Sequence, residues 1–204
     1  MGAWRELRYD DDGTADRIDP RTLSIALEDL LPDDKAVAVD SGHFLGYPSM
    51  FLRVTEARAW VFANAFQAVG LGLGVAIGAA VARPERLTVA AVGDGGLFMA
   101  LEELDTAVRL CLRLLVVVYD DQAYGAEVHH FAPMGHDVRT VRFPDADLAG
   151  IARGAGAQAI TVRSTGDLST VSDWLRDGHG PLVIDAKVNP EVEADWLKEA
   201  FRAG

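Results

Sequence analysis

Short apolar runs alternate with stretches of helical periodicity along most of this chain of 204 residues. A continuous apolar run is typical of a strand that is buried on both faces of a sheet. Strands of this kind, separated by amphipathic helices, build a parallel sheet with helices on both of its faces. We therefore expect an α/β fold of this class, with strands at 36–39, 87–92, 114–119, 158–162 and 182–187.

Helix signals fill the segments between these runs. Asp19 and Pro20 have the residue types of an N-cap and a first helical position, which predicts a helix from there to about 31. Cys111 lies on the apolar face of a helix predicted at 101–111 and is expected in the core. Residues 1–18 are polar and acidic, so we expect an N-terminal arm followed by one domain over 19–204. Further helices are predicted at 147–155, 168–177 and within 190–204.

The glycine-rich segment 65–82 has Gln67 as its one polar side chain, and Gly70, Gly74 and Gly78 repeat at the spacing of a helix-packing motif. Such a segment is either a membrane helix with a dimerisation face or a buried helix whose glycines allow close backbone contact. Strands and helices continue beyond it, which favours the buried helix.

The formal net charge is −12, which argues against nucleic-acid backbones and anionic membranes as partners. It does not exclude a phosphate ligand, because a metal ion and backbone N–H groups can bind phosphate. One cysteine allows no internal disulfide, and the first residues contain no apolar core of signal-peptide length. We therefore expect a reducing, cytoplasmic location.

Polar or glycine-rich clusters directly follow three of the predicted strands, at 40–44, 93–96 and 120–125. In parallel sheets, ligands bind beyond the carboxyl ends of the strands. The glycines of 93–96 allow a backbone to approach a phosphate, but the charge of Asp94 would repel one. A divalent cation resolves this conflict, because Mg²⁺ bridges carboxylate and phosphate oxygens. Asp121 follows 27 residues later, the length of a right-handed crossover, and is the candidate second ligand.

These motifs resemble the C-terminal diphosphate-binding domain of enzymes that depend on thiamine diphosphate, also called thiamine pyrophosphate. The resemblance is closest to the acetolactate synthase and 2-oxo-acid decarboxylase group and covers roughly 20–190. The family signature is Gly-Asp-Gly, about 25 residues, then a pair of asparagines that is often followed by Tyr-Gly. This chain has Gly93-Asp94-Gly95 and then the run 120–125, in which Asp120 and Asp121 stand at the asparagine positions.

The resemblance implies a role for each matching residue. The side chains of Asp94 and Asp121 and the carbonyl of Ala123 would ligate the metal. Gln67 would offer a carbonyl to the amino group of the cofactor, and Val69 would be the apolar wedge that bends it, where a larger residue is more usual. The cofactor-binding set is Ser41, Gly42, His43, Phe44, Gln67, Val69, Gly93, Asp94, Gly95, Gly96, Asp121, Ala123 and Tyr124.

Glu127 follows Tyr124 at the offset where the decarboxylase branch has a proton-relaying glutamate, so it is the candidate catalytic residue. A solvated helix glutamate is an equal alternative. His129 and His130 come next, and adjacent helix residues point in different directions, so that one of them can face the site. The aspartate at 121 should hold a metal more strongly than the usual asparagine while adding repulsion towards the diphosphate.

Enzymes of this family also need a domain that binds the aminopyrimidine of the cofactor. We expect that domain on a second subunit, in a hetero-oligomer whose interface includes the apolar glycine-rich helix. The implied enzyme is a lyase or transferase that decarboxylates a 2-oxo acid or joins the fragment to a second carbonyl. A non-catalytic binding or regulatory remnant of the same fold is the alternative. A dinucleotide-binding protein is a weaker one, because the glycines of 70–74 do not follow a strand.

Overall fold

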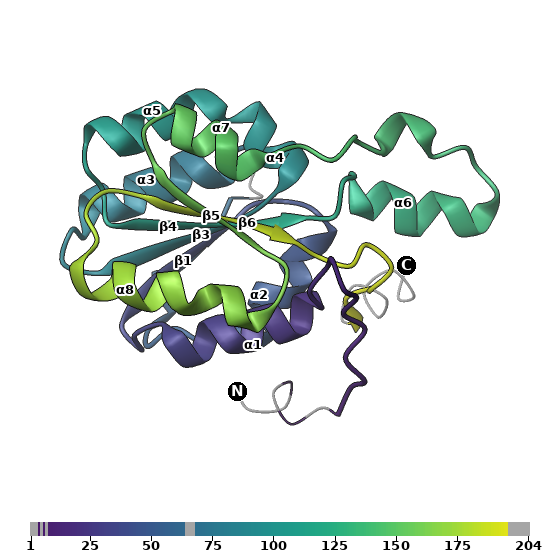
Figure 1. The fold of residues 1–204 in the computed structure, drawn as a ribbon, viewed down its shortest axis with the longest axis horizontal. Coiled ribbons are helices and arrows are strands. Elements are labelled where there is room, and N and C mark those ends of the chain that lie inside the picture. Colours follow the sequence, from purple (N-terminus) through teal and green to yellow (C-terminus); the bar gives the residue numbers. More distant parts are fainter. Residues whose placement is uncertain (1–3, 5, 7, 64–67, 196–204) are drawn as a thin grey trace.

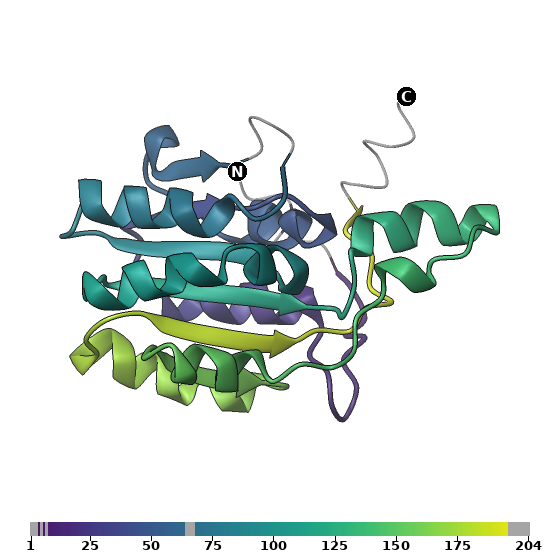
Figure 2. The ribbon, with the colours of Figure 1, turned by 90° about the horizontal axis from the view of Figure 1, so that it is seen from above.

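The computed structural model describes residues 4, 6, 8–63 and 68–195. Within these residues, six strands form one parallel sheet in the order β2-β1-β3-β4-β6-β5 (Figures 1 and 2). This arrangement confirms the predicted α/β fold. The strands are β1 (Lys35–Val39), β2 (Trp60–Phe62), β3 (Leu87–Gly93), β4 (Leu114–Asp120), β5 (Gln158–Val162) and β6 (Leu182–Lys187).

Helices cover both faces of the sheet (Figure 1). Successive strand residues point to opposite faces, so that Val37 and Val39 belong to one buried cluster and Ala38 to the other. On the first face lie α1 (Pro20–Leu30), α2 (Gly46–Phe51) and α8 (Ser169–Asp177). On the second lie α3 (Gly72–Ala82), α4 (Asp94–Met99), α5 (Leu101–Arg109) and α7 (Leu148–Gly154).

One helix, α6 (Gly125–Phe131), projects beyond the carboxyl ends of the strands instead of packing on the sheet (Figures 1 and 2). It continues into a 3₁₀ turn at Ala132–Met134, and the returning chain makes a second one at Arg139–Val141. Further 3₁₀ turns lie at His43–Leu45, Ala57–Ala59 and Thr165–Leu168. Helix α6 therefore flanks the carboxyl edge of the sheet on one side.

The glycine-rich helix starts later than the sequence predicts. Helix α3 begins at Gly72, while Val69 and Gly70 form a turn in which Gly70 has a left-handed φ of 94°. The buried Asp40 carboxylate at the end of β1 accepts the Gly70 N–H at 2.8 Å, and this contact fixes the turn. Residues 64–67, including Gln67, lie outside the described part of the chain. None of the helices that the structure describes is long and apolar enough to cross a membrane.

Two further expectations need correction. Cys111 is exposed and not in the core, because α5 ends at Arg109 and Cys111 has a left-handed φ of 48°. Strand β2 was not predicted, since three half-exposed edge residues give no buried apolar run. The terminal helix expected within 190–204 falls largely outside the described residues, which end at 195.

Candidate functional site

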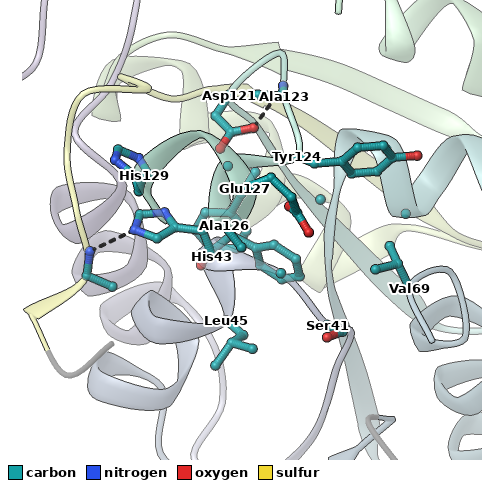
Figure 3. Close-up of a pocket in the computed structure, with 18 of the residues that line it drawn as sticks. Ser41, His43, Leu45, Val69, Asp121, Ala123, Tyr124, Ala126, Glu127 and His129 are labelled. Carbon is teal, nitrogen blue, oxygen red and sulfur yellow. Dashed lines mark hydrogen bonds between the residues drawn. The ribbon is translucent and has the colours of Figure 1, made fainter. Parts of the chain in front are cut away.

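A pocket of about 1090 Å³ opens at the carboxyl ends of β1, β3 and β4, and residues of the projecting helix α6 also line it (Figure 3). It is lined by residues of all three clusters that the sequence singled out. Every predicted site residue that the structure describes lies on its wall, while Gln67 falls outside the described residues. These wall residues are Ser41, Gly42, His43, Phe44, Val69, Gly93, Asp94, Gly95, Gly96, Asp121, Ala123, Tyr124 and Glu127.

Asp94 is the first residue of α4, directly after the central strand β3. It is 3% exposed, and its Oδ1 atom is buried with no hydrogen-bond partner among the residues described. The pKa of Asp94 is raised to about 8, first by burial and then by the charges of Asp121 and Asp120. A buried carboxylate oxygen without a partner is costly unless a cation or a proton satisfies it.

Asp121 follows β4, the neighbour of β3 in the sheet, and its carboxylate faces the pocket (Figure 3). The Ala123 N–H donates to Asp121 Oδ1 at 3.1 Å, and Gln122 between them has a left-handed φ of 60°. A Cβ atom at Gly125 would overlap Asp121 Oδ2, so the absence of a side chain there is required. Burial raises the pKa of Asp121 to about 7, against the lowering effect of the Ala123 N–H.

The oxygen atoms of Asp94, Asp121 and Ala123 form a set of donors that suits a hard divalent cation. Asp94 and Asp121 supply carboxylate oxygens, and Ala123 lies in the same loop with a backbone carbonyl. Mg²⁺ prefers oxygen ligands and uses one or two carboxylates together with water and phosphate oxygens. The described part of the chain holds no group of three or more His, Cys, Asp or Glu side chains that could bind a metal by themselves. Water and the phosphate oxygens of a ligand would therefore complete the coordination.

Glycines give the floor of the pocket its shape. A Cβ at Gly95 would lie 2.5 Å from Tyr124 Cε1, and a Cβ at Gly96 would lie 2.6 Å from Asp40 Oδ2. Gly42 has a φ of 145°, which L side chains rarely adopt. A side chain at Gly95 or Gly96 would displace Tyr124 or Asp40, and one at Gly42 would strain the backbone, so glycine preserves the shape of the pocket lining.

Neighbouring elements hold the 121–124 loop from its outer side. The N–H of Tyr124 donates to the Val141 carbonyl at 2.9 Å, and the N–H of Phe143 donates to the Gln122 carbonyl at 2.7 Å. The Tyr124 and Phe143 rings meet edge to face at 4.7 Å. The loop that carries Asp121 is therefore supported by the chain returning from α6.

Two histidines meet on the other side of the pocket (Figure 3). The His43 and His129 rings lie 4.3 Å apart, and the Ala194 N–H donates to His43 Nε2 at 3.2 Å. His129 Nδ1 lies 3.2 Å from Glu193 Oε1. Both His129 and His130 line the pocket, although the sequence suggested that one would. The contribution of 193–194 was missed, because no motif in the sequence links these residues to the strand ends.

The family model described as the C-terminal thiamine pyrophosphate (TPP) binding domain of thiamine pyrophosphate enzymes matches residues 40–186. The chain belongs to this family. Acetolactate synthase of Bacillus subtilis (strain 168) is 29% identical over 194 residues, covering 93% of this chain and 34% of that protein. Sulfoacetaldehyde acetyltransferase of Castellaniella defragrans is 31% identical over 191 residues, covering 89% of this chain and 31% of that protein. The chain thus spans about a third of the length of these relatives.

Solved structures share the fold of this thiamine pyrophosphate enzyme domain. The 4-hydroxybenzoylformate decarboxylase of Rhodococcus jostii RHA1 matches with a TM-score of 0.80 at 20% identity, over 90% of this chain and 35% of that one. The benzoylformate decarboxylase of Polynucleobacter necessarius matches with a TM-score of 0.82 at 18% identity, over 92% and 36%. At such identities the likeness establishes the architecture of the domain.

Proposed function

We propose that this chain binds thiamine diphosphate and Mg²⁺ in the pocket and supplies the diphosphate and metal end of an active site. The observation that carries the proposal is the pair of pocket-lining carboxylates, Asp94 and Asp121, of which Asp94 is buried and has an Oδ1 atom left without a partner in the described residues. A divalent cation bound to a diphosphate satisfies that oxygen and offsets both charges. Membership of the family supports the identity of the ligand.

Each group of residues that lines the pocket then contacts a different part of the ligand. Asp94, Asp121 and the Ala123 carbonyl hold the metal, while the 41–44 loop and the Gly95–Gly96 backbone contact the diphosphate. Val69, next to the turn at Gly70, is the apolar support for the cofactor, and Tyr124 packs beside it. Glu127 lines the pocket from α6 and is exposed, so it can exchange protons with solvent and with a bound substrate.

The reaction we propose makes or breaks a C–C bond next to a carbonyl, with a 2-oxo acid as substrate. When bound, thiamine diphosphate supplies a nucleophilic carbon and an electron sink for this chemistry. Decarboxylation and acetolactate-synthase-like carboligation share these first requirements. We place the reaction in the cytoplasm, as the single cysteine suggests.

We propose that a second subunit provides the pyrimidine-binding domain, because the described part of the chain exposes an apolar helix face that such a subunit would cover. The exposed face of α3 and its flanks suits such an interface. Leu71 and Val81 are exposed there, and Gly74 and Gly78 have open space where a Cβ would stand. Glycines without neighbours on an apolar helix allow another backbone to approach closely.

Calorimetric titration of the chain with Mg²⁺ and thiamine diphosphate tests the binding step. Saturable binding that needs both components is expected, and Asp94→Ala should abolish it. Wild-type protein that binds thiamine diphosphate equally well in EDTA would contradict the proposed site.

The catalytic step is tested with the partner present. The chain, a co-purifying subunit, Mg²⁺ and thiamine diphosphate are mixed, and consumption of 2-oxo acids and release of CO₂ are measured. Turnover that requires both chains supports the proposed enzyme. Cofactor binding without turnover with any co-purifying partner favours the non-catalytic remnant instead.

A further inference from the structure

Asp120 is buried beside the proposed metal loop, directly before Asp121. The pairing of β4 with β6 places Asp120 next to Lys187, and Lys187 Nζ donates to Asp120 Oδ2 at 2.5 Å. Both side chains are almost inaccessible, at 3% exposed for Lys187 and 2% for Asp120. A buried ion pair of this kind is costly to break on one side, because the remaining charge is left without a partner.

Lys187 makes other contacts with the same ammonium group. It donates to Asp145 Oδ1 at 2.9 Å and to the Ala146 carbonyl at 2.6 Å, and it lies 3.2 Å from Asp185 Oδ2. Burial alone would lower the pKa of Lys187, but the hydrogen bonds to Asp120 and Asp145 raise it to about 12. The ammonium group therefore stays charged at neutral pH and is the cation of a cluster of aspartates.

This cluster lies behind the loop that carries the proposed metal ligand. Asp120 is held from β6, and Asp145 and Ala146 belong to the segment that supports the loop through Phe143 and Gln122. The buried Asp120 carboxylate adds a negative charge directly before the proposed metal ligand Asp121, beside a pocket that is proposed to hold a diphosphate. The Lys187 ammonium offsets that charge within one hydrogen bond.

We propose that Lys187 is a positioning residue for the metal loop, which pairs with Asp120 so that the two side chains together leave no net charge beside Asp121. The inference rests on the proposed function, because its readout is the affinity for Mg²⁺ and thiamine diphosphate. It predicts that Lys187 changes the ligand affinity of the folded protein, which a lysine that only stabilises the fold would not do.

Four variants of the full chain test the dependence, each titrated by calorimetry with Mg²⁺ and thiamine diphosphate. Lys187→Met should lose about tenfold to a hundredfold in affinity, the scale found for lost outer-shell partners. Asp120→Asn should stay within about threefold of wild type, a change well under 1.4 kcal/mol. The double variant Asp120→Asn/Lys187→Met should return to within about threefold of Asp120→Asn, since asparagine needs no counter-charge and burial raises the pKa of Asp185, which can take up a proton when Lys187 is absent. Asp145→Asn, at a half-exposed partner of Lys187, is the control and should bind as wild type does.

The affinity of the folded Lys187→Met variant distinguishes a positioning role from a structural one, because a purely structural ion pair changes the free energy of unfolding and not the binding by the folded protein. If Lys187 only holds the fold, Lys187→Met that is folded by circular dichroism binds as wild type does, and the inference is wrong. If Lys187→Met does not fold, the comparison of the double variant with Asp120→Asn still decides, because equal affinities are expected. Wild-type protein that fails to bind overturns the proposed function itself, whereas wild-type binding without rescue overturns the role of Lys187 alone.

Discussion

At the scale of single residues, the central feature is a pair of pocket-lining carboxylates that form no ion pair with the residues described. Asp94 and Asp121 directly follow neighbouring strands, and desolvation raises the pKa of each. An acid with a raised pKa in the folded state favours folding when it is protonated. Without a cation, the ionised carboxylates of this site therefore lower the free energy of unfolding, and the size of this effect depends on pH.

The free energy of unfolding of the metal-free protein should fall as the pH rises from about 4 to about 8. The pKa of Asp121 is about 7 and that of Asp94 about 8 when folded, against about 4 in an unfolded chain. Their favourable contribution is fully present below about pH 4 and is lost by about pH 8. Thermal unfolding in EDTA, followed by circular dichroism between pH 6.5 and pH 8.5, should show a declining midpoint in wild type.

Asp94→Asn/Asp121→Asn should remove most of that decline and stabilise the metal-free protein at pH 8.5 by on the order of 1–3 kcal/mol. Glu127→Gln is the control, because Glu127 is exposed and should leave the decline unchanged. Equal slopes in wild type and in the double asparagine variant would show that other groups dominate the pH dependence.

Asp121 should tolerate asparagine but not alanine. Asparagine keeps an oxygen for the metal and an acceptor for the Ala123 N–H, whereas alanine removes both. We expect Asp121→Asn to bind Mg²⁺ and thiamine diphosphate within about tenfold of wild type and Asp121→Ala to be weaker by more than about a hundredfold. The measurement is a calorimetric titration, with the circular dichroism spectrum as the control for folding. If Asp121→Ala still binds thiamine diphosphate in a metal-dependent way, the assignment of Asp121 as a metal ligand is wrong.

The sequence was sufficient to predict that Asp94 and Asp121 lie at one pocket, because a turn motif and crossover spacing are local features that the sheet preserves. It could not predict the contact of Lys187 with Asp120, which depends on the pairing of β4 with β6 across 67 residues of chain. Nor did it predict the left-handed φ of Gln122, since glutamine carries no preference for that conformation.

At the scale of elements, the start of α3 is fixed by a contact with a distant strand. Gly70 and Gly72 lie against Asp40 at the end of β1, and the Asp40 carboxylate accepts the Gly70 N–H. Apolar composition alone predicted a longer helix, because it does not register a carboxylate 30 residues away in sequence. The buried strands β3, β4 and β6 were predictable from their apolar runs, whereas β2 at the sheet edge was not.

Glycines within α3 should respond to substitution in opposite directions. A Cβ at Gly72 would lie 2.5 Å from Asp40 Cβ, so Gly72→Ala should destabilise the protein by about 1–3 kcal/mol. Gly74 has nothing within 4 Å of the Cβ position, so Gly74→Ala should stabilise the isolated chain by about 0.5–1 kcal/mol through helix propensity. Urea unfolding of the two variants measures both effects. The same sign for both would contradict the close approach of Gly72 to β1.

At the scale of the whole molecule, the side of the sheet that carries α3, α4 and α5 leaves several large apolar side chains exposed. Phe98 and Met99 on α4 and Leu110 after α5 are exposed, together with Leu71 and Val81 on or beside α3. Scattered apolar residues are ordinary on a surface, but these accompany two exposed glycines on one helix. The arrangement supports the proposed partner interface.

Val81→Glu should weaken association with the partner subunit without unfolding the chain. Val81 is 55% exposed near the end of α3, so a charge there meets solvent in the isolated chain and apolar surface in a complex. We expect at least about a tenfold loss of affinity, or 1.4 kcal/mol, measured by analytical ultracentrifugation of the mixed subunits. Thr170→Glu, exposed on α8 on the opposite face, is the matched control. Equal affinities for both variants would place the interface elsewhere.

The order of the strands also affects how this protein folds while it is being synthesised. Strand β6 is the last in the chain, yet it lies between β4 and β5, and it carries the lysine that pairs with Asp120. Until residues 182–187 have left the exit tunnel, β4 has an open edge and Asp120 has no counter-charge. Parallel pairing over such separations is slow. We therefore expect nascent chains that stop short of β6 to need chaperones, and the metal loop to become competent among the last events of synthesis.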